Sequence, residues 1–491
     1  MELTKVDNWI GGCFVPPKSK EYLSLGCPHS GVIFGSVALS NGEDVEVAVL
    51  CAKKVQVSWM ERTTKARAEV LFKMRELVGA NQQRLVMCIA NEHGKTPFEA
   101  EAEVLKSIEI LGYACSAPQL ISGKIQAVSK GVTCFERRDP VGIVASIVPF
   151  NFPMMVPFWT VPLALVTGNC VILKPSEKAP QTMKLVAEIF KKAGVPDGVF
   201  QIVNGSKNAV EAICDHPDIT LVTFVGTSRV AEMVTHRCRL LNKHVLALGG
   251  AKNFLVAAQD CHVELTSSNV VSSFTGCTGQ RCMAASALII IGDQAQLLDL
   301  IVRKASMLRP KNKQDGVYDK DAIGPVIDGA SKHKIISYID QAEQNGSQIL
   351  LDGREWYKAS ITSEYGEGGY WVGPTVILHA SSDEPAIQEE IFGPVLSVVK
   401  VSTFEEAISI QKSSIYGNAA CIYTSSGEVA EWFASRFEAG MIGINVGVPV
   451  PSEPFSFGGM KMSKFGELDI TGEQAIDLFT VKKKISVRWS Q

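Results

Sequence analysis

The sequence predicts an α/β protein with two parallel-sheet domains and a small β-extension that serves oligomerisation. Short apolar runs alternate with amphipathic helical patterns from Val141 to Ala258, which is typical of parallel strands joined by crossover helices. The same alternation restarts after Gly249 and continues to about residue 450. Two isolated stretches, 122–137 and 476–489, have a strand pattern but are too short to be domains.

Length and composition fit this prediction. With 491 residues, the chain is long enough for about three domains, or for two large domains with an appendage. Hydrophobic residues make up 46% and charged residues 20%, which predicts a packed core rather than a disordered or fibrous chain. The formal charge of -3 provides no positive field, so neither nucleic acid nor a membrane is an expected partner. We expect a small-molecule ligand.

Cysteine usage and the first residues predict the compartment. The 13 cysteines are spread from Cys13 to Cys421 without a C-x-x-C pair or zinc-ligand spacing, which favours a reducing compartment and no bound metal. The first residues, MELTKVDNWIGG, lack the basic head and apolar stretch of a secretory signal. We therefore expect a cytoplasmic protein, although a mitochondrial matrix protein without its presequence would look identical.

Helical periodicity dominates the first third of the chain. Apolar residues recur at three-to-four spacing over 45–57, 65–79, 84–93 and 100–114, which predicts outer helices. The two isolated strand stretches need a sheet to join, and we expect the edge of a partner subunit to provide it.

An uncharged stretch from Pro140 to Leu173 is long enough to cross a bilayer. Its five prolines would break such a helix, and its asparagines would lie unpaired in lipid. The stretch predicts instead a buried strand over 141–147, a Pro-rich loop, a helix over 157–167 and a second buried strand over 170–174.

Cys282 is the candidate nucleophile. It lies in SSFTGCTGQRCMAAS, residues 272–286, after a glycine-rich turn and before small residues that would allow a helix to start. The amides of a helix N-terminus and the adjacent Arg281 would stabilise its thiolate. The alternative is a buried cysteine that only packs. Cys277 competes for the nucleophilic role but precedes the turn.

Further segments place polar side chains at strand ends. Asn151 follows a buried strand and can direct its amide at an oxyanion, although loop capping would also explain it. Lys174 and Glu177 follow the next strand, where they are either ligand-binding or a solvated turn. Thr227 lies in a strand–turn–helix segment that can hold a phosphate, but the glycine-rich nucleotide motifs are missing. The segment QEEIFGPV, residues 388–395, indicates by itself only a strand entrance.

In their order, these segments resemble the aldehyde dehydrogenase superfamily along essentially the entire chain, from WIGG at residue 9 to the strand after FGGMKMSKFG. Within it, PFNFPMMVPFW, LGGAKN and GQRCMA are similar to the coenzyme A-acylating methylmalonate-semialdehyde (or malonate-semialdehyde) dehydrogenase branch. The resemblance implies two Rossmann-like domains and a homodimer or homotetramer. The NAD-binding domain would comprise 1–121 and 141–248, the catalytic domain 249–450, and the oligomerisation strands 122–140 and 470–491.

The resemblance also implies a role for individual residues. Cys282 would be the nucleophile, and Asn151 would form the oxyanion hole with the backbone amide of Cys282. Residues around the cofactor would be Phe150, Lys174, Glu177 and Lys178 for the adenosine half of NAD, Thr227 for the pyrophosphate, Gly249 for the nicotinamide side, and Glu390 with Phe392 for the nicotinamide ribose. The carboxylate of Glu177 would repel a 2′-phosphate, so we expect NAD rather than its 2′-phosphorylated form.

Ala247 departs from the hydrolytic members of the superfamily, which have glutamate in an LELGG motif; this chain reads Leu-Ala-Leu-Gly-Gly. A positioned general base contributes about 10² to 10⁴ in rate, so hydrolysis of a thioacyl enzyme should be slow here. A thiol with a pKa of about 8.5 depends less on such a base than water does. Ala247 therefore predicts transfer of the acyl group to coenzyme A as co-substrate.

The predicted reaction oxidises methylmalonate or malonate semialdehyde to propionyl- or acetyl-coenzyme A with loss of carbon dioxide. Arg281 would bind the substrate carboxylate, as would Lys106, at a position where the branch has arginine; lysine keeps the charge but not the two-pronged geometry. Two alternatives stay open. One is a hydrolytic aldehyde dehydrogenase with another base such as Glu389, and the other is a binding or structural protein without turnover.

Overall fold

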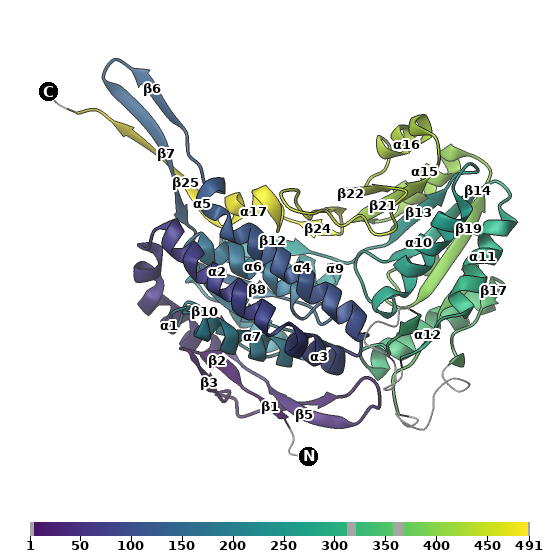
Figure 1. Ribbon diagram of the computed structural model, residues 1–491, viewed down its shortest axis with the longest axis horizontal. Coiled ribbons are helices and arrows are strands. Elements are labelled where there is room, and N and C mark those ends of the chain that lie inside the picture. Colours follow the sequence, from purple (N-terminus) through teal and green to yellow (C-terminus); the bar gives the residue numbers. More distant parts are fainter. Residues whose placement is uncertain (1–3, 312–320, 357–367, 490–491) are drawn as a thin grey trace.

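The computed structural model describes residues 4–311, 321–356 and 368–489. Two lobes, each built around its own sheet, lie side by side, and a slender β-arm projects from the first of them (Figure 1). The predicted α/β fold class is confirmed.

An eight-stranded sheet forms the centre of the first lobe. Its strands are, in spatial order, β24 (Lys464–Phe465), β12 (His244–Leu248), β11 (Ile219–Val225), β8 (Ile143–Ile147), β9 (Cys170–Lys174), β10 (Phe200–Ile202), β2 (Asn8–Ile10) and β3 (Cys13–Val15). The five strands from β12 to β10 run parallel, whereas β24 pairs antiparallel at one edge and the β2–β3 hairpin extends the sheet at the other, with β2 antiparallel to β10. The chain proceeds from β8 through β9 to β10 on one side and then continues with β11 and β12 on the other. The switch point between β8 and β11 is where sheets of this kind bind ligands.

Helices cover both faces of this sheet, and the four predicted in the first third are present. They are α1 (Gly42–Met60), α2 (Thr64–Ala80), α3 (Gln82–His93) and α4 (Pro97–Cys115), followed by the crossover helices α6 (Met155–Val166), α7 (Gln181–Lys192), α8 (Lys207–Asp215) and α9 (Ser228–Leu240). Helix α4 starts where it does because Thr96 and Glu99 form a capping box and Pro97 occupies the first turn.

A seven-stranded sheet forms the second lobe. Its spatial order is β17 (Gln348–Leu351), β18 (Thr375–Leu378), β19 (Val395–Val401), β14 (Ala285–Ile291), β13 (Asn253–Ala257), β21 (Ala419–Tyr423) and β22 (Met441–Ile444). All neighbours pair in parallel except β17 with β18. The covering helices include α10 (Val263–Thr275), α11 (Ala295–Ser306), α12 (Gly329–Gln344), α14 (Pro385–Gln388), α15 (Phe404–Ser413) and α16 (Gly427–Ala434).

The two isolated strand stretches differ from the expectation in two respects. The first stretch forms a hairpin of β6 (Ile125–Ser129) and β7 (Val132–Pro140), which ends three residues later than expected, and β7 pairs antiparallel with β25 (Thr480–Val487). The two stretches therefore join each other within the chain, and the arm in Figure 1 is this three-stranded sheet. Residues 476–478 belong to helix α17 (Gly472–Leu478) instead of a strand.

The uncharged stretch lies inside the first lobe, as predicted. Every residue of β8, β9 and α6 is buried except Met155 at the start of α6. In the part of the chain that the structure describes, we find no helix with the length and apolarity needed to span a bilayer.

Candidate active site

The two sheets present opposite edges to a shared site. In the first sheet, Lys174 is the last residue of β9, and Asn151 and Thr227 follow the carboxyl ends of β8 and β11. Cys282 precedes the amino end of β14, and Glu390 precedes that of β19, in the second sheet. The carboxyl edge of one parallel sheet thus meets the amino edge of the other, which brings together residues that are far apart in the sequence.

Cys282 lies on a turn that leads directly into β14. The expectation that a helix starts at this cysteine is wrong. The turn is held instead by two buried asparagines: the Asn253 side-chain amide donates to the Cys282 carbonyl at 2.7 Å, and the Asn418 amide donates to the same oxygen at 3.1 Å. These two hydrogen bonds fix the backbone carbonyl of Cys282. The Cys282 side chain is half-buried and lines the cavity.

The pKa of the Cys282 thiol is raised to about 12, first by burial and then by the negative charge of Glu390. The backbone amides of Cys282 and Met283 and the charge of Arg281 act in the opposite direction. The predicted stabilisers of the thiolate are therefore present, although the amides belong to a turn, and burial outweighs them.

Asn151 is buried in the loop that follows β8. Its side-chain amide donates to the carbonyl of Gln280 at 2.9 Å, two residues before the nucleophile. An asparagine amide has two hydrogens, so one remains for a second acceptor.

A buried ion pair between Lys95, just before helix α4, and Glu103 on that helix holds the Asn151 loop. The Lys95 ammonium donates to the Asn151 carbonyl at 2.7 Å and to Glu103 at 2.8 Å, and both of these charged side chains are fully buried. The second oxygen of Glu103 accepts the backbone N–H groups of Met154 and Met155. Sequence reasoning missed this pair, for which the segment HGKTPFEAEAE gives no local signal.

The predicted adenosine and pyrophosphate residues lie together along the switch-point edge. Lys174 is buried, donates to the carbonyl of Gly205 at 3.0 Å and pairs with Glu177 at 3.2 Å. Burial lowers the pKa of Lys174 in spite of Glu177. Thr227 is the N-cap of α9, and Gly249 follows the adjacent β12.

Aromatic rings border the same edge. Phe150 packs edge-to-face on Phe392, with ring centroids 6.0 Å apart, and Lys178 lies 5.4 Å from the centre of the Phe150 ring. Lys178 also pairs with Asp328. Phe392 has a positive φ of 61°, an uncommon backbone conformation for a bulky residue and one that is often found at functional sites.

Glu390 lies beside the glycines that follow β12. Its Oε1 accepts the backbone N–H of Ala251 at 2.9 Å, and a Cβ on Gly250 would lie 2.5 Å from its Oε2. Glycine is therefore required at 250 for the carboxylate to approach the chain so closely. Burial raises the pKa of Glu390, and the Ala251 N–H opposes this shift.

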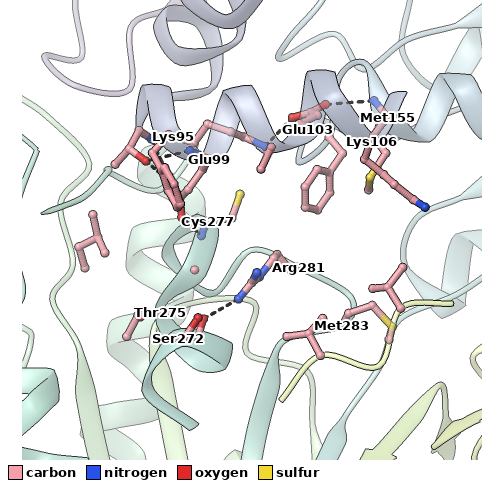
Figure 2. A pocket seen from close by; sticks show the side chains of 18 of the residues that line it. Lys95, Glu99, Glu103, Lys106, Met155, Ser272, Thr275, Cys277, Arg281 and Met283 are labelled. Atoms are coloured by element: carbon pink, nitrogen blue, oxygen red, sulfur yellow. Dashed lines mark hydrogen bonds and ion pairs between the residues drawn. The ribbon is translucent and has the colours of Figure 1, made fainter. Parts of the chain in front are cut away.

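A cavity of about 770 Å³ opens in front of Cys282. Its wall includes both predicted substrate-binding cations: Lys106 comes from α4, and Arg281 comes from the Cys282 segment across the cavity (Figure 2). Arg281 donates through Nη2 to the carbonyls of Ser272 and Ser273 at 2.7 and 2.9 Å, and its Nε is buried with no partner among the described residues. Lys106 pairs with Glu109 at 2.9 Å and with Glu453 at 3.1 Å, which the sequence did not suggest.

Ala247 is fully buried near the carboxyl end of β12, paired with Phe224 and Phe465. Glu389, the alternative base, is exposed and accepts a hydrogen bond from Tyr338. It is not part of the cavity wall that the described residues form.

Cys277, the rival cysteine, also lines the cavity but is buried in a different environment. Its backbone is in the left-handed region, its amide donates to Glu99, and its sulfur lies 3.9 Å from His93 Nε2. Burial raises the pKa of its thiol to about 11. Its carbonyl accepts the side-chain amide of Gln280 at 3.3 Å, whereas the Cys282 carbonyl accepts those of Asn253 and Asn418.

Cys282 faces a cavity, and basic, acidic and aromatic side chains line the switch-point edge beside it. This arrangement defines a class of enzyme in which a cysteine sulfur attacks an electrophilic carbon next to a bound dinucleotide. The sequence profile of the aldehyde dehydrogenase family matches residues 14–485. The chain belongs to this family.

Individual relatives cover the whole chain. Malonate-semialdehyde dehydrogenase 1 of Oceanobacillus iheyensis is 39% identical over 490 residues, which are 99% of this chain and 99% of that protein. A Sinorhizobium meliloti protein described as a methylmalonate-semialdehyde dehydrogenase, solved in complex with NAD, superposes with a TM-score of 0.96 at 35% identity, covering 100% and 99% of the two chains. The methylmalonate-semialdehyde dehydrogenase of Oceanimonas doudoroffii has a TM-score of 0.95 at 36% identity, with the same coverage.

Proposed function

We propose that this chain is an NAD-dependent, coenzyme A-acylating dehydrogenase that converts methylmalonate or malonate semialdehyde to propionyl- or acetyl-coenzyme A and carbon dioxide. One observation carries the proposal: Cys282 faces a cavity that also contains the guanidinium of Arg281, while position 247 has a buried methyl group instead of a carboxylate. The names of the relatives support the same substrates.

The donor set at the switch-point edge suits NAD. Lys174 and Glu177 offer an ammonium and a carboxylate side by side, which is the pair needed for the hydroxyls of a ribose. Thr227 at the start of α9 would meet the pyrophosphate, with Gly249 beside it towards the nicotinamide. Phe150 and Lys178 would border the adenosine half, while Glu390 and Phe392 would hold the nicotinamide ribose. When bound, NAD supplies the acceptor for the hydride that leaves the substrate carbon.

The chain's own residues perform the carbon–sulfur chemistry. The Cys282 thiolate adds to the aldehyde carbon, and the resulting oxyanion accepts hydrogen bonds from the Cys282 backbone N–H and from the free amide hydrogen of Asn151. The Asn253 and Asn418 bonds to the Cys282 carbonyl keep this N–H in place. Loss of hydride leaves the acyl group as a thioester on Cys282.

Release of the acyl group requires an acceptor that works without a base at position 247. The thiolate of coenzyme A attacks the thioester carbon, and Cys282 leaves as thiolate. The β-carboxylate of the acyl group is lost as carbon dioxide, and the enolate that this leaves takes up one proton from solvent. Hydrolysis is disfavoured because Glu389 lies on the surface and because Glu103 is committed to Lys95 and two backbone amides.

The proposed assembly is a homo-oligomer, a dimer or a tetramer, formed through the β-arm. Strand β6 is an edge strand of the arm and exposes Ile125 (76%) and Val128 (54%). An exposed apolar edge of this kind requires a partner, and a second copy of the chain would provide one.

A single-turnover experiment tests the proposed intermediate. Enzyme, NAD and malonate semialdehyde without coenzyme A should give a protein carrying one acyl group on Cys282, as seen by mass spectrometry of the intact chain and its peptides. Addition of coenzyme A should then remove the acyl group and produce acetyl-coenzyme A. The Cys282→Ser variant should form neither product, and NADH formation at the full rate by this variant would contradict the proposal.

A further inference from the structure

We propose that Glu453 is a specificity-determining residue: its carboxylate holds Lys106 in an ion pair, so a carboxylated aldehyde must displace Glu453 to use the charge of Lys106. The inference rests on the proposed function for the identity of the substrate. It deepens that function, because it predicts how strongly this cavity selects carboxylated aldehydes over uncharged ones.

Lys106 is a cavity residue whose charge is already matched. Glu103 and Lys106 lie on the face of α4 that borders the cavity, with Glu99 one turn earlier (Figure 2). The Lys106 ammonium lies 3.1 Å from Glu453 Oε2 and 2.9 Å from Glu109 Oε1. Burial lowers the pKa of Lys106, but its hydrogen bonds to the two carboxylates outweigh this effect and raise it.

The two carboxylates differ in their contact with water. The side chain of Glu453 is only 6% exposed, and that of Glu109 is 55% exposed. Water screens an exposed ion pair strongly and a buried one much less, so Glu453 is the effective counter-ion of Lys106.

Arg281 on the opposite wall shows the contrast. No carboxylate among the described residues forms an ion pair with it, and its Nε has no partner there. A carboxylated substrate therefore meets Arg281, which has unused hydrogen-bond donors, and Lys106, which is already paired with the carboxylate of Glu453. The cavity consequently selects carboxylated aldehydes less strongly than its two cations would suggest.

Glu453→Gln tests this inference because glutamine keeps the shape and removes the charge. The measurement is the ratio of kcat/KM for malonate semialdehyde to that for propanal, a three-carbon aldehyde without the carboxylate. We expect this ratio to rise roughly threefold to tenfold in Glu453→Gln and less than about twofold in Glu109→Gln. The matched control is Glu473→Gln. Glu473 is exposed, and its backbone N–H donates to the carbonyl of Pro454, the residue that follows Glu453. This control should leave the ratio where it is.

A double variant separates the electrostatic role from a structural one. If Glu453 acts through Lys106, its removal should no longer raise the ratio in a Lys106→Met background. A ratio that is unchanged or lower in Glu453→Gln, or a rise that persists without Lys106, would overturn the inference.

Binding of malonate distinguishes this inference from the proposed function. Titration calorimetry with malonate should show tighter binding to Glu453→Gln than to the unmodified chain, by a factor similar to the change in ratio. If malonate binds more tightly to Glu453→Gln but the enzyme does not turn over malonate semialdehyde, the role of Glu453 is upheld and the proposed substrate is rejected. Turnover as proposed with equal malonate affinity of the two proteins would reject the role of Glu453.

Discussion

Cys282 has the nucleophilic position but a thiol whose pKa burial raises to about 12. Only the thiolate form of a cysteine reacts with iodoacetamide. Below pH 12, the thiolate fraction of Cys282 rises with pH. We expect the carbamidomethylation rate of Cys282 in the free enzyme to increase about tenfold per pH unit from pH 7 to pH 10. Peptide mass spectrometry measures this rate, with free glutathione, which levels off above about pH 8.5, as the reference. A plateau for Cys282 below pH 9 would show that the free enzyme already stabilises its thiolate.

Glu177 should exclude the 2′-phosphorylated cofactor by charge. Replacing it with glutamine removes one negative charge next to Lys174 and should raise the kcat/KM ratio of NADP to NAD about tenfold. Glu188→Gln on the neighbouring helix α7 is the control, since its charge faces Arg84. A ratio that is the same in Glu177→Gln and in the unmodified enzyme would contradict the assignment of Glu177 to the ribose.

Several site residues could be predicted singly, but their connections could not. Cys282, Asn151 and Glu390 follow from the resemblance, because short motifs surround each of them. Asn418 and Glu453 escaped notice because their partners are 136 and 347 residues away in the sequence. Local patterns carry no information on which distant carboxylate meets a lysine.

At the scale of elements, helix α4 and the Asn151 loop depend on the buried pair of Lys95 and Glu103. Glu103→Gln would leave a buried ammonium without its counter-charge and weaken the acceptor of two backbone amides. We expect a loss of about 3–5 kcal/mol in the free energy of unfolding, measured by urea denaturation. Glu76→Gln on the exposed face of α2 should change it by less than about 0.5 kcal/mol. Equal stabilities of the two variants would mean that the pair is dispensable.

Helices with a periodic pattern and strands with a continuous apolar run were predictable, whereas the N-terminal strands were not. The helices α1 to α4 and the parallel strands β8, β9, β11 and β12 agree with the sequence because burial on one or both faces sets their pattern. The N-terminal strands β1 (Thr4–Val6), β4 (Tyr22–Gly26) and β5 (Ile33–Ala38) were missed, as was β3, because their mixed burial leaves no continuous apolar run. Strand β2 is buried but has only three residues. The pairing of β7 with β25 joins segments about 340 residues apart, which no local pattern encodes.

For the whole molecule, the β-arm should determine the assembly. Ile125→Asp together with Val128→Asp places two charges on the exposed edge strand β6 without touching the core. We expect light scattering to show a fall in molar mass to that of one chain, with the secondary structure retained by circular dichroism. An unchanged oligomer would mean that other surfaces hold the subunits together.

The absent carboxylate at position 247 gives the whole enzyme its choice of acyl acceptor. The most direct measurement is steady-state NADH formation from methylmalonate or malonate semialdehyde, with and without coenzyme A. Because no base at position 247 activates water, we predict turnover about 10² to 10⁴ times slower without coenzyme A, after a burst of one NADH per active site. Equal rates with and without coenzyme A would contradict the account and make the protein a hydrolytic dehydrogenase.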